Sequence, residues 1–276
     1  MNNDDESKSE MRPLESEIVK KTEPKKDSSV KWVSAITLIL ILGLGVFFYF
    51  NNLPRRFSPS FPVPLPIQSV HDDNLIILKT IDFKEPLKKY WKEHDFNSET
   101  SYEVQNGILH ALSHGNSSMI YQEVHIDLKD RPFLTWEWKA VQFPANKKGK
   151  GLTAKSDNDF AGRVYVIFKG KNPIAADVIQ YVWDDHYPEG TSSDSPFLKN
   201  VRIIVVQSGK SDEWVSEKRD ILSDYHTFFG RSPRWPLSAI GIMSDSDNTK
   251  TQSEIFFRNL SIKKPKSAEI PQQFDL

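Results

Sequence analysis

The residues with the clearest potential for chemistry are Asp245-Ser-Asp-Asn-Thr249, which directly follow a predicted strand. Carboxylate and amide oxygens at such short spacing are the ligands that Ca²⁺ prefers. The segment is not an EF-hand, because Lys250 stands where the loop glycine belongs and Phe256 where the closing glutamate belongs. A turn bonded to its own backbone is the alternative to a metal or ligand site. The site residues would be Asp245 and Asp247 for Ca²⁺, with Asn248 added for another ligand.

A second polar group, Asp157-Asn-Asp159, precedes the predicted strand Val164–Phe168. Arg163 lies at the start of that strand, in alternation with Val164. Its guanidinium could pair with a carboxylate inside the fold or reach a ligand. Asp159 and Arg163 are therefore candidate binding residues, and a loop cap with a structural ion pair is the alternative.

Aromatic and acidic residues meet at the end of another predicted strand, in Trp183-Asp184-Asp185-His186. An aromatic ring can stack on a pyranose face while carboxylates bind its hydroxyls, so Trp183 and Asp184 are candidate sugar contacts. A glycosidase would need two carboxyls about 5–9.5 Å apart across a cleft, and a sequence does not give that distance. Solvated loop acids are the alternative.

A third charged group surrounds a predicted helix and comprises Arg219, Asp220 and Asp224. If all three lie on that helix, Asp220 and Asp224 share one face and Arg219 is offset. They could form a polar site against a sheet or the solvated side of the helix. Lys147, Lys148 and Lys150 predict a solvated basic loop.

Composition excludes several classes of protein. The chain has no cysteine, which removes disulfides, thiolate nucleophiles and Cys-zinc sites. Its net charge of −1 argues against binding to nucleic acid. The H-E-x-x-H and G-x-S-x-G motifs are missing from the sequence, so a common motif-bearing hydrolase is not indicated. The sequence assigns no catalytic residue.

These groups have to be positioned by a mainly β domain. Leu134–Ala140 alternates apolar and polar residues, as expected for a half-buried strand. Ile221, Leu222, Tyr225, Phe228 and Phe229 recur at helical spacing before Gly230, which predicts one short helix with a glycine C-cap. About nine strands and one helix predict a single antiparallel β-sandwich of the jelly-roll kind. The other expected strands are Ile108–Ser113, Ser118–Val124, Val164–Phe168, Val178–Trp183, Val201–Val206, Leu237–Met243 and Ile255–Ile262.

An uncharged segment, Trp32–Phe50, precedes this domain. It would span about 28 Å as a helix, close to the thickness of a bilayer core. Six Lys/Arg occur in the twenty residues ending at Lys31, against two in the twenty after Phe50. This asymmetry predicts an uncleaved single-pass signal anchor in the bacterial inner membrane, with a cytoplasmic N-terminus and a periplasmic or extracellular domain.

The expected domain organisation follows from these segments. Residues 1–31 form a polar cytoplasmic tail, 32–50 the transmembrane anchor and 51–70 a proline-rich stalk. Residues 71–265 form the β-sandwich, and 266–276 form a flexible tail.

Taken together, several of these segments resemble the bacterial domain of unknown function 3047 family. The resemblance extends over residues 83–262, and the Lys147–Gly151 loop is longer and more basic than the family pattern. It implies an extracytoplasmic sandwich like galactose-binding or carbohydrate-binding modules, and it implies no activity. The segments that carry it are Leu134–Trp138, Asp157–Val166, Tyr181–Trp183, Arg219–Gly230 and Ile240–Thr249.

Three functional hypotheses follow. The first is a tethered binding module for envelope glycan or another small polar ligand. The second is a carbohydrate-active hydrolase or lyase with paired carboxylates, and the third is a structural envelope protein. They differ in whether Asp159, Arg163, Asp220, Asp245 and Asp247 converge in one concavity.

Overall fold

A computed structural model of the chain describes residues 74–171 and 175–266. The predicted tail, anchor Trp32–Phe50 and stalk lie outside these residues, as does nearly all of the C-terminal tail. Within the described part, no helix is both long and apolar enough to cross a membrane.

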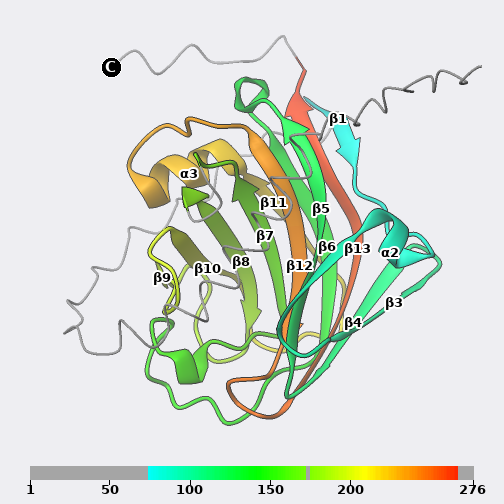
Figure 1. The fold of residues 1–276 in the computed structure, drawn as a ribbon, viewed down its shortest axis with the longest axis vertical. Coiled ribbons are helices and arrows are strands. Elements are labelled where there is room, and N and C mark those ends of the chain that lie inside the picture. Colours follow the sequence, from blue (N-terminus) through cyan, green and yellow to red (C-terminus); the bar gives the residue numbers. More distant parts are fainter. Residues whose placement is uncertain (1–73, 172–174, 267–276) are drawn as a thin grey trace, which may run out of the picture.

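The described residues form two sheets packed face to face (Figure 1). The first sheet has the order β11-β6-β13-β4-β3, and β1 pairs with β13 beside β4. The second has the order β2-β5-β12-β7-β8-β10-β9. The first sheet consists of β1 (Leu75–Thr80), β3 (Ser101–Gln105), β4 (Ile108–His114), β6 (Phe133–Gln142), β11 (Val215–Asp220) and β13 (Gln252–Pro265). The second consists of β2 (Lys92–Asn97), β5 (Ser117–Ile126), β7 (Gly162–Phe168), β8 (Val178–Asp184), β9 (Ser192–Asp194), β10 (Val201–Ser208) and β12 (Leu237–Asp245).

The mainly β sandwich is confirmed, with two corrections to its details. β8 and β10 pair in parallel, whereas the prediction was a purely antiparallel fold. A four-residue helix, α2 (Leu87–Tyr90), accompanies the predicted helix α3 (Ile221–Phe229). Two short 3₁₀ turns, η3 (Leu128–Asp130) and η4 (Lys155–Asp157), also occur.

The helix α3 has the predicted boundaries for local reasons. Asp220 accepts a hydrogen bond from the Ser223 backbone N–H at 2.9 Å and so caps the first turn. Gly230 ends the helix with a φ of 61°, the left-handed conformation that glycine adopts without a steric penalty.

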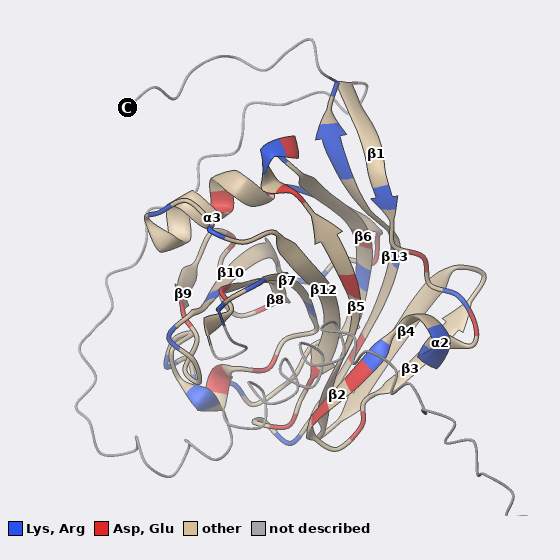
Figure 2. Ribbon diagram, turned by 45° about the horizontal axis from the view of Figure 1, so that its top comes forward, with Lys and Arg blue, Asp and Glu red and all other residues tan. Residues whose placement is uncertain are grey.

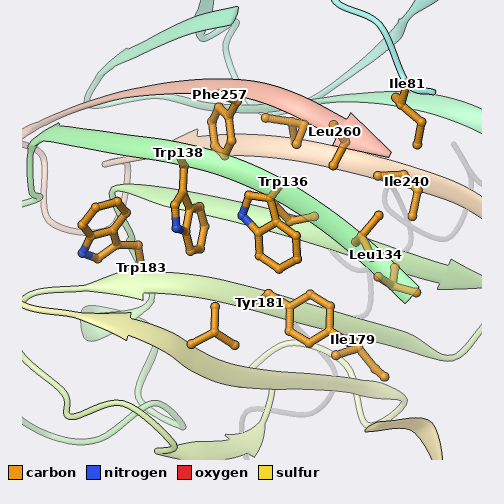
Figure 3. Packing of buried hydrophobic residues seen from close by; sticks show 14 of the residues in the cluster. Ile81, Leu134, Trp136, Trp138, Ile179, Tyr181, Trp183, Ile240, Phe257 and Leu260 are labelled. Carbon is orange, nitrogen blue, oxygen red and sulfur yellow. The ribbon is translucent and has the colours of Figure 1, made fainter. Parts of the chain in front are cut away.

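Aromatic side chains from both sheets fill the space between them (Figure 3). Alternation along β6 sends Leu134, Trp136 and Trp138 inward, as predicted. The Trp136 ring stacks on Tyr181 of β8 with centroids 5.5 Å apart. These contacts hold the two sheets together. The opposite face of β7, β8 and β12 points away from this core.

Lys/Arg and Asp/Glu segments are interspersed along the described strands and loops (Figure 2). This agrees with the balanced overall charge.

Candidate functional site

A cavity of about 400 Å³ lies on the face of the seven-stranded sheet that points away from the six-stranded sheet. Alternation along β7 creates this face: Val164 and Val166 pack in the core between the sheets, while Arg163, Tyr165 and Ile167 line the cavity. The volume lies in the range of small-molecule binding sites in proteins.

Arg163 is the centre of the cavity's polar end. It is 2% exposed, and its Nε donates to Asp245 Oδ1 at 2.9 Å while its Nη2 donates to Asp245 Oδ2. Nη1 donates to Gln180 Oε1 at 2.9 Å, and Nη2 also donates to the Asn158 carbonyl at 2.6 Å. The two hydrogen bonds to Asp245 on β12, together with the one to Gln180 on β8, fix the guanidinium of Arg163 between these strands.

Asp159 organises the loop after β12. Its Oδ1 accepts from the Asn248 side-chain Nδ2 at 2.9 Å, and its Oδ2 accepts from the Thr249 backbone N–H at 2.6 Å. Residues 247–250 form a turn, and these bonds tie that turn to the loop before β7. The same turn carries Asp247 at the cavity.

The carboxylates at this end have unusual electrostatics. Burial raises the pKa of Asp245 to about 7, an effect that Arg163 opposes and Asp159 reinforces. Burial and the neighbouring Asp159 also raise the pKa of Asp247. For Arg163, burial alone would lower the pKa, but Asp245 raises it above its ordinary value, so the guanidinium stays charged.

Asp159, Asp245 and Asp247 each offer an oxygen within 4.8 Å of the others, a spacing at which three carboxylates could bind one metal ion. Ca²⁺, however, takes about six to eight oxygen ligands. Both oxygens of Asp245 already accept from Arg163, and both oxygens of Asp159 accept from the loop after β12. The donor set fits Ca²⁺ poorly, because three carboxylates supply fewer ligands than the ion takes and it would lie beside the Arg163 guanidinium.

The Asn158 side chain at this end is only partly hydrogen-bonded within the described residues. Asn158 is 3% exposed and lines the cavity, and its Oδ1 accepts from Arg163 Nη2 at 3.0 Å. Within the described residues its Nδ2 has no hydrogen-bond partner. A buried amide donor without a partner is costly, so Asn158 points to a ligand atom that accepts a hydrogen bond.

The remaining walls of the cavity are largely apolar. They include Met119 of β5, Tyr165 and Ile167 of β7, and Met243 of β12. Phe197 and Leu198, from the loop between β9 and β10, form one rim. Sequence analysis missed these walls, because β7 is apolar at nearly every position and such a run does not show which residues face outward.

Trp183 and Asp184 do not belong to this site. Trp183 is fully buried between the sheets, and its Nε1 donates to the Gly209 carbonyl at 2.8 Å. The buried Asp184 carboxylate pairs with Lys147 and accepts from the His186 backbone N–H at 2.7 Å. The structure does not bring the predicted ligand contacts Trp183 and Asp184 to the cavity, because core packing and an ion pair occupy them.

Lys147 departs from the predicted solvated basic loop, whereas Lys148 and Lys150 of that loop are exposed. The Lys147 side chain is 4% exposed, and its Nζ lies 4.5 Å from the Phe160 ring centroid as well as pairing with Asp184. Burial lowers the pKa of Lys147 to about 8.

Arg219, Asp220 and Asp224 form a separate structural cluster. Arg219 lies on β11 rather than on the helix, and it donates to Asp224 through Nε at 2.9 Å and Nη2 at 2.6 Å. Asp224 also accepts from the Tyr181 hydroxyl at 2.6 Å. Asp220 caps α3 and accepts from Arg131 Nε at 3.0 Å. The structure does not bring these three predicted ligand-binding residues to the cavity, because their bonds attach α3 and β11 to the sandwich.

Glu217 lies on β11, where its register partner on β6 is Trp136. Among the described residues its buried Oε1 has no hydrogen-bond partner. Burial raises the pKa of Glu217 from 4.5 to about 8, and the charge of Arg219 opposes this only in part. The carboxyl is therefore largely protonated at neutral pH.

We expect this carboxyl to make stability fall as pH rises. The native state holds a proton that the unfolded state loses above about pH 4.5, so stability declines from there up to the folded pKa of about 8. Urea unfolding midpoints across this window measure the decline. Glu217→Gln, which keeps a neutral polar group, should flatten it, and an equal slope in the variant would contradict the assignment.

The structure thus brings together five of the predicted residues and separates the other five. Asp159, Arg163, Asp245, Asp247 and Asn248 converge at one end of the cavity. Trp183, Asp184, Arg219, Asp220 and Asp224 lie in two structural clusters. Gln180 was missed, although it is a polar residue within an otherwise apolar predicted strand and could have been noticed for that reason.

Comparison with known proteins gives one family match. The family described as "Protein of unknown function (DUF3047)" matches residues 89–261. None of the curated proteins matches this chain.

Several solved structures are similar to this chain at low identity. The family 11 carbohydrate-binding module of a cellulosomal cellulase from Clostridium thermocellum is 10% identical, covers 68% of this chain and 94% of its own, and has a TM-score of 0.38. The xyloglucanase domain of a type three effector from Sinorhizobium fredii, in complex with cellobiose, is 9% identical, covers 67% of this chain and 97% of its own, and has a TM-score of 0.40. Similarities at these TM-scores carry no argument about a ligand.

Proposed function

This chain belongs to the DUF3047 family of proteins of unknown function, and we propose that it is a binding module whose cavity holds a hydroxyl-bearing ligand such as a saccharide. The ligand's polar group lies at the Arg163–Asp245 end of the cavity. The proposal includes the predicted anchor Trp32–Phe50, which would present the domain to the cell envelope outside the cytoplasm.

The observation that carries the proposal is that a buried donor without a partner and a partly exposed carboxylate line the same cavity. The buried Asn158 Nδ2 requires an acceptor. Asp247, the least buried of the three carboxylates, accepts from Asn248 Nδ2 at 3.3 Å and interacts with Ser117 and Asn97. A carboxylate has about four acceptor positions, so Asp247 can accept a further hydrogen bond from a ligand. Asn158 and Asp247 both line the cavity. A hydroxyl group donates and accepts at once, so neighbouring hydroxyls of a saccharide satisfy both residues.

The hydrolase or lyase alternative is less well supported by the same geometry. A glycosidase needs one carboxyl as acid and a second as base or nucleophile, both open to the substrate. Asp245 is held by Arg163 and Asp159 by the loop after β12, which leaves Asp247 without an available partner of this kind in the described cavity.

The proposal predicts that Asp247→Asn weakens saccharide binding by about tenfold or more, because a hydrogen bond to a charged group contributes about 1.5–3 kcal/mol. Binding of the full chain in lipid nanodiscs would be screened on a glycan array and measured by calorimetry. The melting temperature should change little, because Asp247 is only partly buried.

Asp212→Asn, which removes an exposed carboxylate elsewhere, serves as the matched control and should bind like the unmodified chain. Repeating the titration with EDTA and with added Ca²⁺ tests the Ca²⁺ hypothesis, and we expect equal affinities. Failure of every glycan to bind above empty nanodiscs, or unchanged binding by Asp247→Asn, would overturn the proposal.

A further inference from the structure

We infer that the ligand of this cavity is amphipathic, with an alkyl or acyl chain attached to its hydroxyl-bearing head. This inference rests on the proposed function and concerns the part of the cavity that the head leaves uncovered. It assigns the polar end to the head and the rest of the cavity to the chain.

The two parts of the cavity are separated along the strands. Arg163 begins the cavity-facing row of β7 and Ile167 ends it, and four residues of strand span about 13 Å. Asp245 lies opposite the Arg163 end, because Met243 and Arg163 are register partners in the β12–β7 pair. Val178 and Val201 line the cavity near the Ile167 end, where β8 and β10 begin.

The apolar part offers little to a second polar group. The Tyr165 hydroxyl is already directed at Met243 Sδ, 3.0 Å away. At the rim, Asn200 donates its Nδ2 to the Ala176 carbonyl, and Ser195 Oγ accepts from the Phe197 backbone N–H at 3.2 Å. Hydroxyls placed here would lose their bonds to water without replacement, which is unfavourable.

A hydrocarbon chain, unlike a hydroxyl group, gains free energy when it moves from water into the apolar part of the cavity. Each methylene removed from water improves affinity by roughly fourfold, and Met119, Tyr165, Ile167 and Met243 provide an apolar surface for it. A head with a chain of a few carbons therefore uses both parts of the cavity, whereas a longer saccharide would use only one.

Such a molecule could come from a glycolipid in the membrane or from a free acylated saccharide. The shared chemistry is a sugar head with an apolar chain. Vesicles that contain a glucosyl diacylglycerol should displace a bound soluble probe only if the cavity can draw the chain from a bilayer, so this competition distinguishes the two sources.

The test compares hexyl and methyl β-glycosides of glucose, galactose, mannose and N-acetylglucosamine, with hexanol as the headless probe. Affinities for the full chain in nanodiscs are measured by calorimetry, with empty nanodiscs as the blank. We expect at least one hexyl glycoside to bind about tenfold or more tightly than its methyl counterpart. Hexanol should bind more weakly than that hexyl glycoside.

Two variants test which end of the cavity holds the chain and which holds the head. Phe197→Ala truncates a rim residue that is 43% exposed and should reduce the hexyl-to-methyl ratio by several-fold without loss of folding. Trp235→Ala, an aromatic that is 41% exposed and does not line the cavity, is its matched control and should leave the ratio unchanged. Asp247→Asn should weaken both glycosides by the same factor.

The outcomes separate this inference from the proposed function. Equal affinities for hexyl and methyl glycosides would overturn the amphipathic ligand while leaving saccharide binding in place. Hexanol binding as tightly as the hexyl glycosides, with no effect of Asp247→Asn, would overturn the assignment of the head. If none of the glycosides binds and the glycan array is also negative, both proposals are wrong.

Discussion

Arg163→Ala is expected to lower the free energy of unfolding by about 3–5 kcal/mol, the loss typical of breaking a buried ion pair. The substitution would leave Asp245 buried beside Asp159 without its counter-charge. It would also remove the donors that hold Gln180 and the Asn158 carbonyl. Urea unfolding of the full chain at neutral pH measures the effect.

The same pair provides an internal control for that measurement. Asp245→Asn in the Arg163→Ala background removes the stranded charge, so the double variant should lose less stability than the sum of the two single variants. A loss below about 1 kcal/mol in Arg163→Ala, or strictly additive effects, would show that the pair is not a buried electrostatic unit.

Asp224→Ala is expected to have a similarly large effect, about 3 kcal/mol or more. It would leave the Arg219 guanidinium and the Tyr181 hydroxyl without the carboxylate that accepts from both, inside the sandwich and beneath α3. Thermal unfolding followed by circular dichroism gives the change in stability. Asp224→Asn, which keeps one acceptor oxygen, should lose less.

This variant also distinguishes the structural cluster from the cavity. Asp224 does not line the cavity, so the folded fraction of Asp224→Ala should bind saccharide with unchanged affinity. Glu213→Ala, at an exposed position before β11, should leave both stability and binding unchanged. A selective loss of binding in Asp224→Ala would contradict the separation of the two groups.

Sequence patterns predicted those strands and helices in which the apolar residues of the local pattern are also the residues that face the core. The alternation in β6 and the capped helix α3 are two such elements, because each has one side facing the core and clear end signals. β11 was missed for the opposite reason. Its inward positions include Glu217 and Arg219, and Arg219 is neutralised by Asp224 from α3, a partner that no local pattern reveals.

The candidate site was predictable in part. Arg163 and Asp245 were selected by residue type and position at strand ends, and the β7–β12 register then brings them together. The same reasoning selected Trp183, which folds into the core. Arg219 was selected for its place beside a predicted helix, and it forms an ion pair with Asp224. Strand neighbours decide between these outcomes, and the order of strands in a sheet is set by long-range packing that a single sequence does not show.

The antiparallel pair of β1 and β13 has a mechanical consequence. Leu75 pairs with Pro265, and the Lys266 backbone N–H donates to the Asn74 carbonyl at 2.8 Å, so both ends of the described domain leave from one corner (Figure 1). A force that separates these two ends would load the hydrogen bonds of this pair one after another, since they lie perpendicular to the strands. The domain would therefore yield to such a pull by unzipping β1 first, at low force, while the cavity on the opposite sheet stays intact.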